Sequence, residues 1–488
     1  MEPCDARPAG GLLRRLAERS GAGWLAIGTG FDAPDVEEAG LSHLNSRTIE
    51  ALSADPPHQR ADATDEGGID DPFPTDWESR VDSWLRPTRG TLFEVIYTSG
   101  TTGLPKGVML DHGTILSTLQ AISLILPARE ERTVSLLPAS HLFDQAPILF
   151  YGLSIGADIL YLRSRTPRII FKALAEHHVT TMVVVPQLLQ LFWNGLTREI
   201  EKRGQTKTFE RARRVARFLP YWARRLLFRR LHQQLGGSLR LFVSAAAYLP
   251  PALQEQWESL GIIVLQGYGA TECGPAAATS VMDHPVGTVG KTVAPVKLKL
   301  DPQSREILVG GPTIFRGYWD DETATAEAQT DGWYRTGDIG TFDTRGNLVL
   351  SGRTKNVIVL PNGLNVFPED IENMLEQVGI AHAVVLETAP GRIEAVVLNP
   401  DAPPVISATS PAPKAPASDE EAKALRVRID SLIKQANARL GQHQRIDAWR
   451  LWPDADFPRT HTLKIKRGPV REWAGAATPL PVREVEIS

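Results

Sequence analysis

Apolar segments of two kinds alternate along residues 92–350 of the chain. Short runs rich in β-branched and aliphatic residues predict strands, and apolar positions that recur every three or four residues predict helices. Strands are expected at 92–96, 133–137, 181–185, 239–243 and 262–266, and helices at 115–126, 169–177 and 251–260. This alternation predicts βαβ units, which build mainly parallel sheets covered by helices.

The segments on either side carry different patterns. Residues 290–350 place many turn residues between short strands, which predicts a smaller antiparallel lobe. Near the start, only Trp24–Ile27 predicts a strand, and residues 55–82 are rich in Asp, Glu, Pro and Gly, as loops and disordered segments are. Residues 400–420 are rich in Ala, Pro and Ser and predict a flexible loop, and a helix is expected over 420–440.

Composition narrows the class of protein. The chain has 488 residues, which is enough for about three domains. A formal net charge of −4 argues against a dedicated nucleic-acid binder, which would be strongly basic. Two cysteines, Cys4 and Cys273, cannot form a disulfide framework or a zinc site, which suits a reducing cytoplasm. Neither a secretory signal nor a membrane-spanning apolar run is visible, so a cytoplasmic protein is expected.

The segment Tyr97–Val108 has the composition of a phosphate-binding loop. It reads Tyr-Thr-Ser-Gly-Thr-Thr-Gly-Leu-Pro-Lys-Gly-Val and follows the strand at 92–96, which is expected to be buried. Glycines let the backbone approach an anion, hydroxyl groups donate hydrogen bonds, and a lysine adds a positive charge. The spacing differs from that of a Walker P-loop, because Gly107 rather than Ser or Thr follows Lys106.

This segment resembles the signature loop of the acyl-adenylate-forming superfamily, which includes acyl-CoA synthetases, firefly luciferase and the adenylation domains of peptide synthetases. In that family the loop is mobile and wraps the β- and γ-phosphates of ATP. Relatives usually carry a longer segment before this loop, so residues 1–90 are expected to be a shortened, partly disordered N-terminal segment. The resemblance implies that these residues bind the nucleotide: Thr98, Ser99, Gly100, Thr101, Thr102, Gly103 and Lys106.

A second motif, Gly267-Tyr-Gly-Ala-Thr-Glu272, follows the strand expected to end at Gln266. It is therefore predicted at the carboxyl end of a sheet strand, where α/β proteins bind ligands. A carboxylate beside a hydroxyl is the kind of oxygen ligand that Mg²⁺ takes when it also holds phosphates. The resemblance implies that Glu272 ligates Mg²⁺, Thr271 contacts the α-phosphate, Tyr268 stacks on adenine, Gly269 lies at the nucleotide and Gly267 borders the substrate pocket.

The segment Ser244-Ala-Ala-Ala-Tyr-Leu-Pro is similar to the family's loop along the adenine edge. The resemblance implies that Ser244, Ala245 and Ala246 contact the nucleotide. Alanines replace the two glycines that are usual in this loop, and Tyr248 replaces a proline. Because alanine is less free in φ and ψ than glycine, a stiffer loop is expected.

Two further motifs supply single polar side chains. The segment Pro138–Asp144 places His141 after a strand. A lone histidine is more often structural than catalytic, but the resemblance implies that His141 borders the acyl carboxylate as a substrate-pocket residue. The segment Tyr334–Gly340 is expected to hold Asp338 in a turn, and the resemblance makes Asp338 the ligand of the ribose hydroxyls.

Two basic segments follow. Gly352-Arg-Thr-Lys-Asn resembles the family's interdomain segment, which implies that Arg353 contacts the nucleotide and Lys355 is the hinge. Asn356 stands where the family usually has Asp, and a modest effect is expected. By the same resemblance, Gly363 lines the tunnel for the pantetheine of CoA. The segment 458–467 is by itself a solvated or anion-binding strand, but the resemblance implies that Lys464 enters the active site for adenylation.

Residues 198–230 are strongly basic and carry the aromatic residues Phe218, Tyr221, Trp222 and Phe228 on a helical pattern. Two interpretations stay open. The helices could pack their aromatic side chains on the body of the protein and leave the charges in water. Alternatively, they could lie on an anionic membrane surface, as basic amphipathic helices do. Long-chain acyl-CoA synthetases carry a similar basic insertion at the equivalent place.

The resemblance covers about residues 91–470 and implies an α/β fold. A large adenylation domain of mainly parallel sheets with an antiparallel lobe is expected over 91–352, and a small mobile α+β domain over 353–488. The expected activity is that of a long-chain or medium-chain fatty acid:CoA ligase, with ATP, Mg²⁺ and CoA. The alternatives are a ligase that loads an acyl-carrier protein, and a catalytically weak nucleotide-binding remnant.

Overall fold

The computed structural model describes most of the chain after residue 86. The described residues are 24–27, 45–48, 87–98, 105–126, 131–162, 166–361, 364–380, 382–389, 391–400, 419–454, 456–459, 465–476 and 480–481. They belong to two compact units: Met1–Gly113 with Arg316–Thr325, and Thr114–Phe315 with Ala326–Ser488. The predicted domain boundary between residues 352 and 353 stays a prediction.

The first unit is built on an antiparallel hairpin. Strand β3 (Leu92–Thr98) pairs with β4 (Lys106–Asp111), and β14 (Gly317–Tyr318) pairs with the other side of β4. The prediction that the first of these strands is buried is wrong: only Ile96 of β3 is buried, because β3 lies at the edge of this three-stranded sheet. The predicted strand at Trp24–Ile27 is confirmed as β1, which pairs with β2 (Asn45–Thr48).

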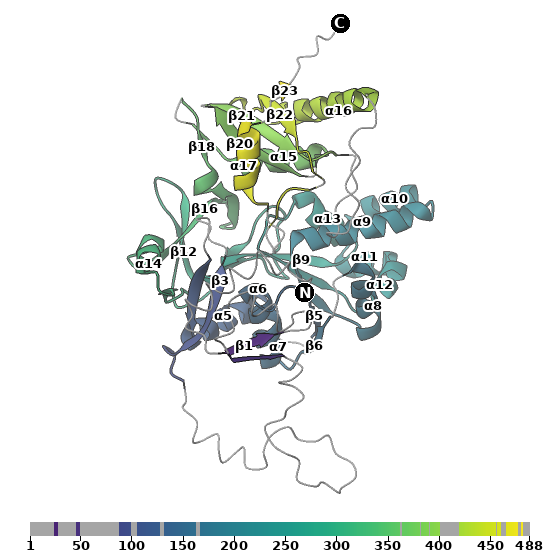
Figure 1. Cartoon of the computed structure of the whole chain (residues 1–488). Coiled ribbons are helices and arrows are strands. Elements are labelled where there is room, and N and C mark those ends of the chain that lie inside the picture. Colours follow the sequence, from purple (N-terminus) through teal and green to yellow (C-terminus); the bar gives the residue numbers. More distant parts are fainter. Residues whose placement is uncertain are drawn as a thin grey trace. The chain divides into compact units, whose positions relative to one another are not determined.

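The second unit contains a seven-stranded sheet in the order β11-β10-β9-β8-β7-β5-β6 (Figure 1). The five strands from β9 to β6 are parallel, as predicted. The strands are β5 (Arg132–Ser135), β6 (Asp158–Tyr161), β7 (Thr181–Val184), β8 (Leu241–Ser244), β9 (Ile263–Ala270), β10 (Gly274–Ala278) and β11 (Lys291–Thr292). Helix α5 (His112–Ile125) precedes β5, and the main helices between the strands are α8 (Pro167–His177), α9 (Pro186–Lys202) and α13 (Pro251–Ser259).

The core of this sheet is aromatic. Trp257 on α13 is fully buried, and its ring lies 5.1 Å from that of Phe242 on β8 and 5.5 Å from that of Trp193 on α9. The indole N–H of Trp257 donates to the carbonyl oxygen of Leu189 over 3.3 Å. Because edge-to-face aromatic pairs and buried area stabilise together, these contacts fix both helices against the central strands.

The predicted antiparallel lobe is confirmed. It consists of β12 (Lys297–Leu300), β13 (Glu306–Gly310), β15 (Gln329–Thr330), β16 (Trp333–Phe342) and β17 (Leu348–Arg353), all paired antiparallel. After it come a one-turn 3₁₀ segment η2 (Thr354–Asn356), the short pair β18 (Ile358–Val359) and β19 (Asn365–Val366), and a four-stranded sheet of β20 (Ala383–Ala389), β21 (Arg392–Val397), β22 (Ala448–Leu451) and β23 (Leu480–Pro481).

Three helices accompany the last sheet: α15 (Pro368–Val378), α16 (Asp419–Asn437) and α17 (Arg467–Ala476). Helix α16 confirms the helix that was expected over 420–440. The loop predicted at 400–420 lies almost entirely outside the described residues, as does 55–82.

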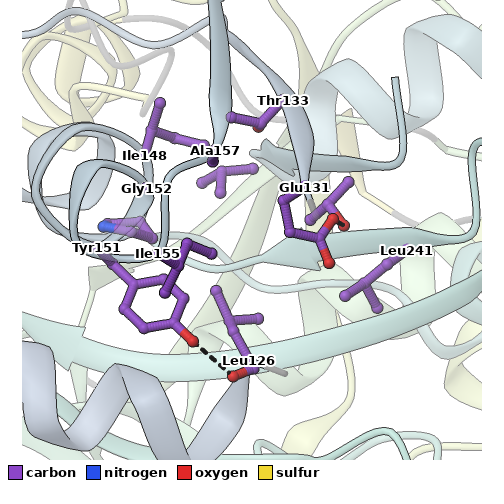
Figure 2. Close-up of a pocket in the computed structure, with 12 residues that line it drawn as sticks. Leu126, Glu131, Thr133, Ile148, Tyr151, Gly152, Ile155, Ala157 and Leu241 are labelled. Atoms are coloured by element: carbon purple, nitrogen blue, oxygen red, sulfur yellow. Dashed lines mark hydrogen bonds between the residues drawn. The ribbon is translucent and has the colours of Figure 1, made fainter. Parts of the chain in front are cut away.

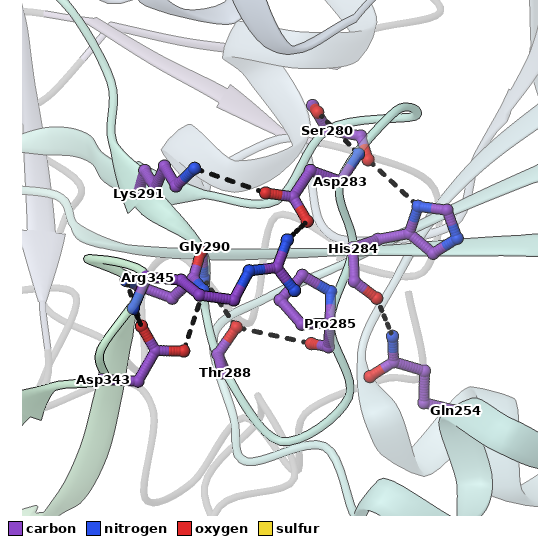
Figure 3. Close-up of polar contacts among 11 residues, drawn as sticks. Gln254, Ser280, Asp283, His284, Pro285, Thr288, Gly290, Lys291, Asp343 and Arg345 are labelled. Atoms are coloured by element: carbon purple, nitrogen blue, oxygen red, sulfur yellow. Dashed lines mark hydrogen bonds and ion pairs between the residues drawn. The ribbon is translucent and has the colours of Figure 1, made fainter.

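Polar contacts tie the antiparallel lobe to the edge of the seven-stranded sheet (Figure 3). Asp283 accepts from Lys291 on β11 at 3.3 Å and from Arg345, in the turn between β16 and β17, at 2.7 Å. In addition, the backbone of Leu348 on β17 exchanges hydrogen bonds with Val289 and Gly290. These contacts set where β16 and β17 lie relative to the end of β9.

Candidate active site

The signature loop connects β3 and β4. Thr98 and Lys106 face each other across the ends of the two strands, and the Thr98 hydroxyl donates to the Lys106 carbonyl over 3.5 Å. The Lys106 ammonium lies 4.8 Å from the centre of the Tyr318 ring. Ser99, Gly100, Thr101, Thr102 and Gly103 lie outside the described residues. The structure therefore places both ends of this loop on one hairpin.

Gly107 has a packing role. A Cβ atom at this position would lie 2.9 Å from the Val95 side chain and 3.1 Å from that of Trp319, while the Trp319 N–H donates to the Gly107 carbonyl over 2.7 Å. Only glycine fits such a close approach. The packing of the sheet is therefore sufficient to explain the third glycine of the motif, without a contact to phosphate.

Two of the predicted nucleotide loops meet at the carboxyl edge of the parallel sheet. Ser244 at the end of β8 is the register partner of Gln266 on β9, so Ala245 and Gly267 follow side by side. A Cβ atom on Gly267 would lie 3.7 Å from that of Ala245. The Ser244 hydroxyl is buried and has no hydrogen-bond partner among the described residues.

Ala246 has a φ of +68°, in the left-handed region. This conformation is usual for glycine and costs about 1 kcal/mol for a residue with a Cβ atom. The loop therefore keeps a glycine-like backbone although alanine stands there. Whether the loop is also stiffer stays a prediction.

The strand before the second motif is longer than predicted. It was expected to end at Gln266, but β9 continues to Ala270, because after Gln266 it exchanges its parallel neighbour β8 for the antiparallel strand β10. Gly269 lies at this crossing, where an added Cβ atom would be 2.1 Å from the Gly274 carbonyl oxygen. Thr271 and Glu272 occupy the turn that follows and are half-buried.

Three of the predicted site residues form one hydrogen-bonded cluster, Tyr268–Asp338–Arg353. The Tyr268 hydroxyl donates to Asp338 Oδ2 over 2.9 Å, and Arg353 Nε lies 2.7 Å from Asp338 Oδ1. Asp338 and Arg353 are register partners on β16 and β17. Burial, together with the charge of Asp338, raises the pKa of Tyr268 well above its ordinary value, so this phenol stays a donor.

The prediction that Asp338 lies in a turn is wrong. Asp338 is inside β16, next to Gly337, whose φ is +70°, and a register shift follows between Ile339 and Gly340. The Gly-Asp pair marks this irregularity within a strand. Sequence reasoning also missed Glu306 and Thr336: the buried Glu306 carboxylate accepts from the Gly337 N–H at 3.0 Å, and the Thr336 hydroxyl accepts from the Asp338 N–H at 3.0 Å.

His141 lies after β5, at the same carboxyl edge of the sheet, with β7 between β5 and β8. It is half-buried and precedes a short helix (Leu142–Asp144), which continues into the π-helical segment η1 (Gln145–Phe150). The carbonyl of His141 accepts from the N–H groups of Asp144 and Gln145 at 2.9 and 3.1 Å. The role of His141 in a substrate pocket stays a prediction.

The segment after Arg353 shows why Asn356 is tolerated. The Asn356 side-chain amide donates to Glu369 over 2.6 Å. An aspartate here would place two carboxylates together, whereas the amide supplies a proton. Lys355 lies in η2, so it occupies the short connection that was predicted as the hinge. Gly363 and Lys464 lie outside the described residues, although Arg459 and Ile465, which flank the Lys464 segment, form an antiparallel bridge.

A cavity of about 30 Å³ lies between Leu126, Ile148, Tyr151 and Leu241 (Figure 2). In its lining, the Tyr151 hydroxyl donates a hydrogen bond of 2.9 Å to the Leu126 carbonyl. None of the predicted site residues lines it. It is water-sized and does not hold a substrate.

The described residues contain no group of three or more histidine, cysteine, aspartate or glutamate side chains that could hold a metal by themselves. Mg²⁺, however, usually takes one or two carboxylates and completes its shell with water and substrate phosphates. A half-buried Glu272 beside Thr271, in a turn at the carboxyl edge of the sheet, fits that mode.

In open α/β sheets, ligands bind in the crevice outside the carboxyl ends of the strands, and the polar loops of this protein gather at that edge. The chain belongs to the AMP-binding enzyme family, whose model matches residues 17–319. This confirms the resemblance seen in the sequence.

Similar proteins are fatty-acid ligases. The long-chain-fatty-acid–CoA ligase FadD15 of Mycobacterium bovis is 32% identical over 78% of this chain and 67% of its own length. The putative fatty-acid–CoA ligase fadD11 of Mycobacterium tuberculosis is 30% identical over 80% of this chain and 73% of its own. The crystal structure of ATP-bound MatB from Rhodopseudomonas palustris matches with a TM-score of 0.68 at 20% identity, covering 95% and 81% of the two chains, which shows the shared fold.

Proposed function

We propose that this protein activates a fatty acid with ATP to an acyl-adenylate and then transfers the acyl group to CoA. The observation that supports the proposal is the cluster Tyr268–Asp338–Arg353, with contacts of 2.9 and 2.7 Å, because it brings together one residue from each of three separate motifs to which the resemblance assigns nucleotide binding. The names of FadD15 and fadD11 support a fatty acid as the acyl substrate.

The first step turns a poor acylating agent into a good one. A carboxylate oxygen of the fatty acid attacks the α-phosphorus of ATP, the bond to the bridging oxygen breaks, and pyrophosphate leaves. Enzymes accelerate such transfers by positioning the reactants and by stabilising developing charge. In this proposal Asp338 accepts from the ribose hydroxyls, Tyr268 packs on adenine, and the buried Ser244 hydroxyl finds in the nucleotide the partner that it lacks.

In this proposal, other residues contact the phosphates and neutralise their negative charge. The signature loop with Thr98 and Lys106 holds the departing pyrophosphate, Thr271 contacts the α-phosphate, and Lys464 stabilises the transition state. Mg²⁺, held by Glu272, would neutralise phosphate charge. In the second step the CoA thiolate attacks the acyl carbonyl carbon and AMP leaves. For that step we propose a rotation at Lys355, which withdraws Lys464 and opens a tunnel beside Gly363.

The test is pyrophosphate release by the purified chain with ATP, Mg²⁺ and a panel of acids from acetate to oleate, each with and without CoA. The proposal predicts release that depends on a medium or long acid and becomes faster with CoA. An acyl-carrier protein in place of CoA is the matched comparison. If the carrier protein accelerates turnover and CoA does not, the carrier protein is the acyl acceptor. ATP binding without pyrophosphate release with any of the acids would contradict the proposal.

A further inference from the structure

We propose that a second cavity, which lies beside η2, binds the phosphate group of a small molecule. The cavity has a volume of about 320 Å³ and is formed by three parts of the chain: η2 with the start of β18, the end of β20, and the first turns of α17. Figure 1 shows α17 lying beside β20. None of the cluster Tyr268–Asp338–Arg353 lines this cavity, so it is separate from the predicted nucleotide site.

The volume of this cavity suits a small ligand. Sites for small molecules in proteins have volumes of about 300–1000 Å³, whereas a water molecule takes about 30 Å³ in the liquid. The cavity between Leu126 and Tyr151 is water-sized, but the cavity beside η2 reaches the lower end of the range for ligands. It therefore has room for a phosphate group and some of the atoms attached to it.

Three basic side chains line the cavity. Lys355 comes from η2, and Arg467 and Arg471 come from α17. Because residues four positions apart lie on one face of a helix, the two arginines face the cavity together. A phosphate group offers three terminal oxygens to three cations, whereas a carboxylate offers two, and arginine binds phosphate through parallel pairs of hydrogen bonds. The lining therefore favours a phosphate-bearing ligand.

Arg467 is held in position by the protein itself. Its Nη2 lies 2.6 Å from both carboxylate oxygens of Glu372 and 3.6 Å from Glu369, and its Nη1 donates to the Val385 carbonyl over 3.1 Å. Neither carboxylate lines the cavity. Since the guanidinium is already fixed, a ligand that binds to it does not have to order this long side chain.

The remaining charged groups leave the lining positive. Arg471 is exposed, and among the described residues no carboxylate forms an ion pair with it. Glu387 is the one acidic residue in the described lining, and its Oε1 accepts from the Gly391 N–H at 2.8 Å. Three cations and one carboxylate thus border the space, which attracts an anion.

Basic side chains are also frequent on α10 (Thr206–Ala216) and α11 (Tyr221–Leu227), but with a different arrangement. Phe218 and Trp222 are exposed there, so the interpretation that all four aromatic residues of that segment pack on the body is wrong for these two, although Phe228 is buried. No described helix is long and apolar enough to cross a membrane. The cavity beside η2, in contrast, gathers its cations around one space.

A phosphate group in this cavity would connect two segments of the small domain. Lys355 lies in η2, and Arg467 begins α17 three positions after Lys464. The consequence for the reaction rests on the proposed function, in which a rotation at Lys355 withdraws Lys464. A ligand that contacts both Lys355 and α17 restrains that rotation and slows the change from one half-reaction to the other.

The experiment is isothermal titration of the full chain without ATP, fatty acid or CoA, so that a failure of the ligase proposal does not affect it. Inorganic pyrophosphate and adenosine 3′,5′-bisphosphate, the phosphate-bearing end of CoA, represent the two sources of the phosphate group. Malonate, which carries two carboxylates, is the control for charge alone. We expect at least one of the phosphate ligands to bind, and malonate to bind about tenfold or more weakly.

Two variants change the affinity in opposite directions. Arg471→Gln should weaken phosphate binding about 10- to 100-fold, because it removes hydrogen bonds between charged groups. Glu387→Gln should strengthen it up to about fivefold, because a repelling charge is lost while the amide oxygen can still accept from Gly391. The matched control is Arg445→Gln, an exposed arginine outside the lining, which should bind as the parent does. Circular dichroism checks that each variant is folded.

Hydrogen exchange locates the ligand, since the signature loop could also take up pyrophosphate. The ligand should slow exchange in residues 385–387 and 467–471 of the parent and not of Arg471→Gln. Binding of pyrophosphate at this place shows that a free anion suffices, and binding of the bisphosphate alone assigns the site to the phosphate end of CoA. Absence of protection in both segments, affinities that Arg471→Gln leaves unchanged, or equally tight binding of malonate would overturn the proposal.

Discussion

The two regions that we propose to bind the nucleotide are built in opposite ways. The β3–β4 hairpin presents its loop from one continuous stretch of sequence, and the Thr98 hydroxyl makes only a long bond of 3.5 Å. The cluster Tyr268–Asp338–Arg353 comes from three strands, and each Asp338 oxygen already has a partner within 3 Å. The Thr98 hydroxyl therefore makes only a weak contact with the hairpin, whereas the Asp338 carboxylate of the cluster is already held by two neighbours.

Because of this difference, substitutions in the two regions should have different effects on the stability of the fold and on the rate of the reaction. Substitutions in the cluster should alter ATP binding and also the free energy of unfolding, because they break contacts of the folded chain. Substitutions in the segments that act on the phosphates should alter the rate of adenylation and leave stability unchanged. The predictions that follow test this division, beginning with the largest effect.

Lys464→Ala should lower the rate of acyl-adenylate formation about 10²- to 10³-fold, because one stabilising group is lost from the transition state. Its effect on thermal stability should be negligible. Thioester formation from supplied acyl-adenylate should persist, and single-turnover assays of the two half-reactions measure both. Lys466→Ala is the control from the same segment. Equal loss in both half-reactions would remove Lys464 from the adenylation step.

Asp338→Asn should raise the KM for ATP about 10- to 100-fold, because hydrogen bonds to a charged group are replaced by weaker ones. The Arg353 side chain is 53% exposed, so the loss of its ion pair should cost no more than about 1 kcal/mol of stability. Asp283→Asn is the matched control, since Asp283 also binds two cations, Lys291 and Arg345. An unchanged KM in Asp338→Asn would contradict the ribose assignment.

Tyr268→Phe should cost about 1 kcal/mol of unfolding free energy and raise the KM for ATP up to about tenfold. The folded-state pKa of Tyr268 is raised above its unfolded value, so its stabilising effect is complete below about pH 10 and is lost as the pH rises further. The stability gap between parent and variant should therefore be constant up to about pH 9 and shrink as the pH rises above about 10.

Tyr151→Phe is the control for this comparison, because Tyr151 is also buried and donates to a carbonyl at 2.9 Å. It should lose similar stability at neutral pH and keep the parent's KM for ATP. A shift in KM as large as that of Tyr268→Phe would show that any buried tyrosine hydroxyl affects the nucleotide.

Ala246→Gly should have the smallest effect. Glycine relieves the positive φ of +68°, which should stabilise the chain by up to about 1 kcal/mol and leave turnover nearly unchanged. Ala245→Gly, at a position without positive φ, should be neutral or destabilising. Chemical denaturation measures the free energy of unfolding of both variants. A lower stability of Ala246→Gly than of the parent would contradict the claim that the backbone of Ala246 is strained.

The buried strands were predictable because their side chains are apolar on both faces. All four residues of β7 are buried, and its predicted range of 181–185 differs from the observed Thr181–Val184 by one residue. The motifs could be recognised for a related reason, since each is a short continuous stretch of sequence. The family follows from the motifs, and their position after predicted strands places them at the carboxyl edge of the sheet.

What the sequence could not show depends on residues far apart in the chain. The continuation of β9 past Gln266 requires β10 as a new neighbour. Asp338 lies in a strand only because β13 and β17 pair with β16 on either side. Phe218 and Phe228 have the same side chain, but 90% of one and 8% of the other is exposed, which only the packing of the helices decides.

The most direct test of the central claim is the fate of a labelled carboxylate oxygen. A fatty acid with ¹⁸O in its carboxylate is converted with ATP, Mg²⁺ and CoA, and the products are analysed by mass spectrometry. If the carboxylate attacks the α-phosphorus, AMP should carry one ¹⁸O atom after the thiol has displaced it. Label in inorganic phosphate, with ADP as the nucleotide product, would contradict adenylate formation.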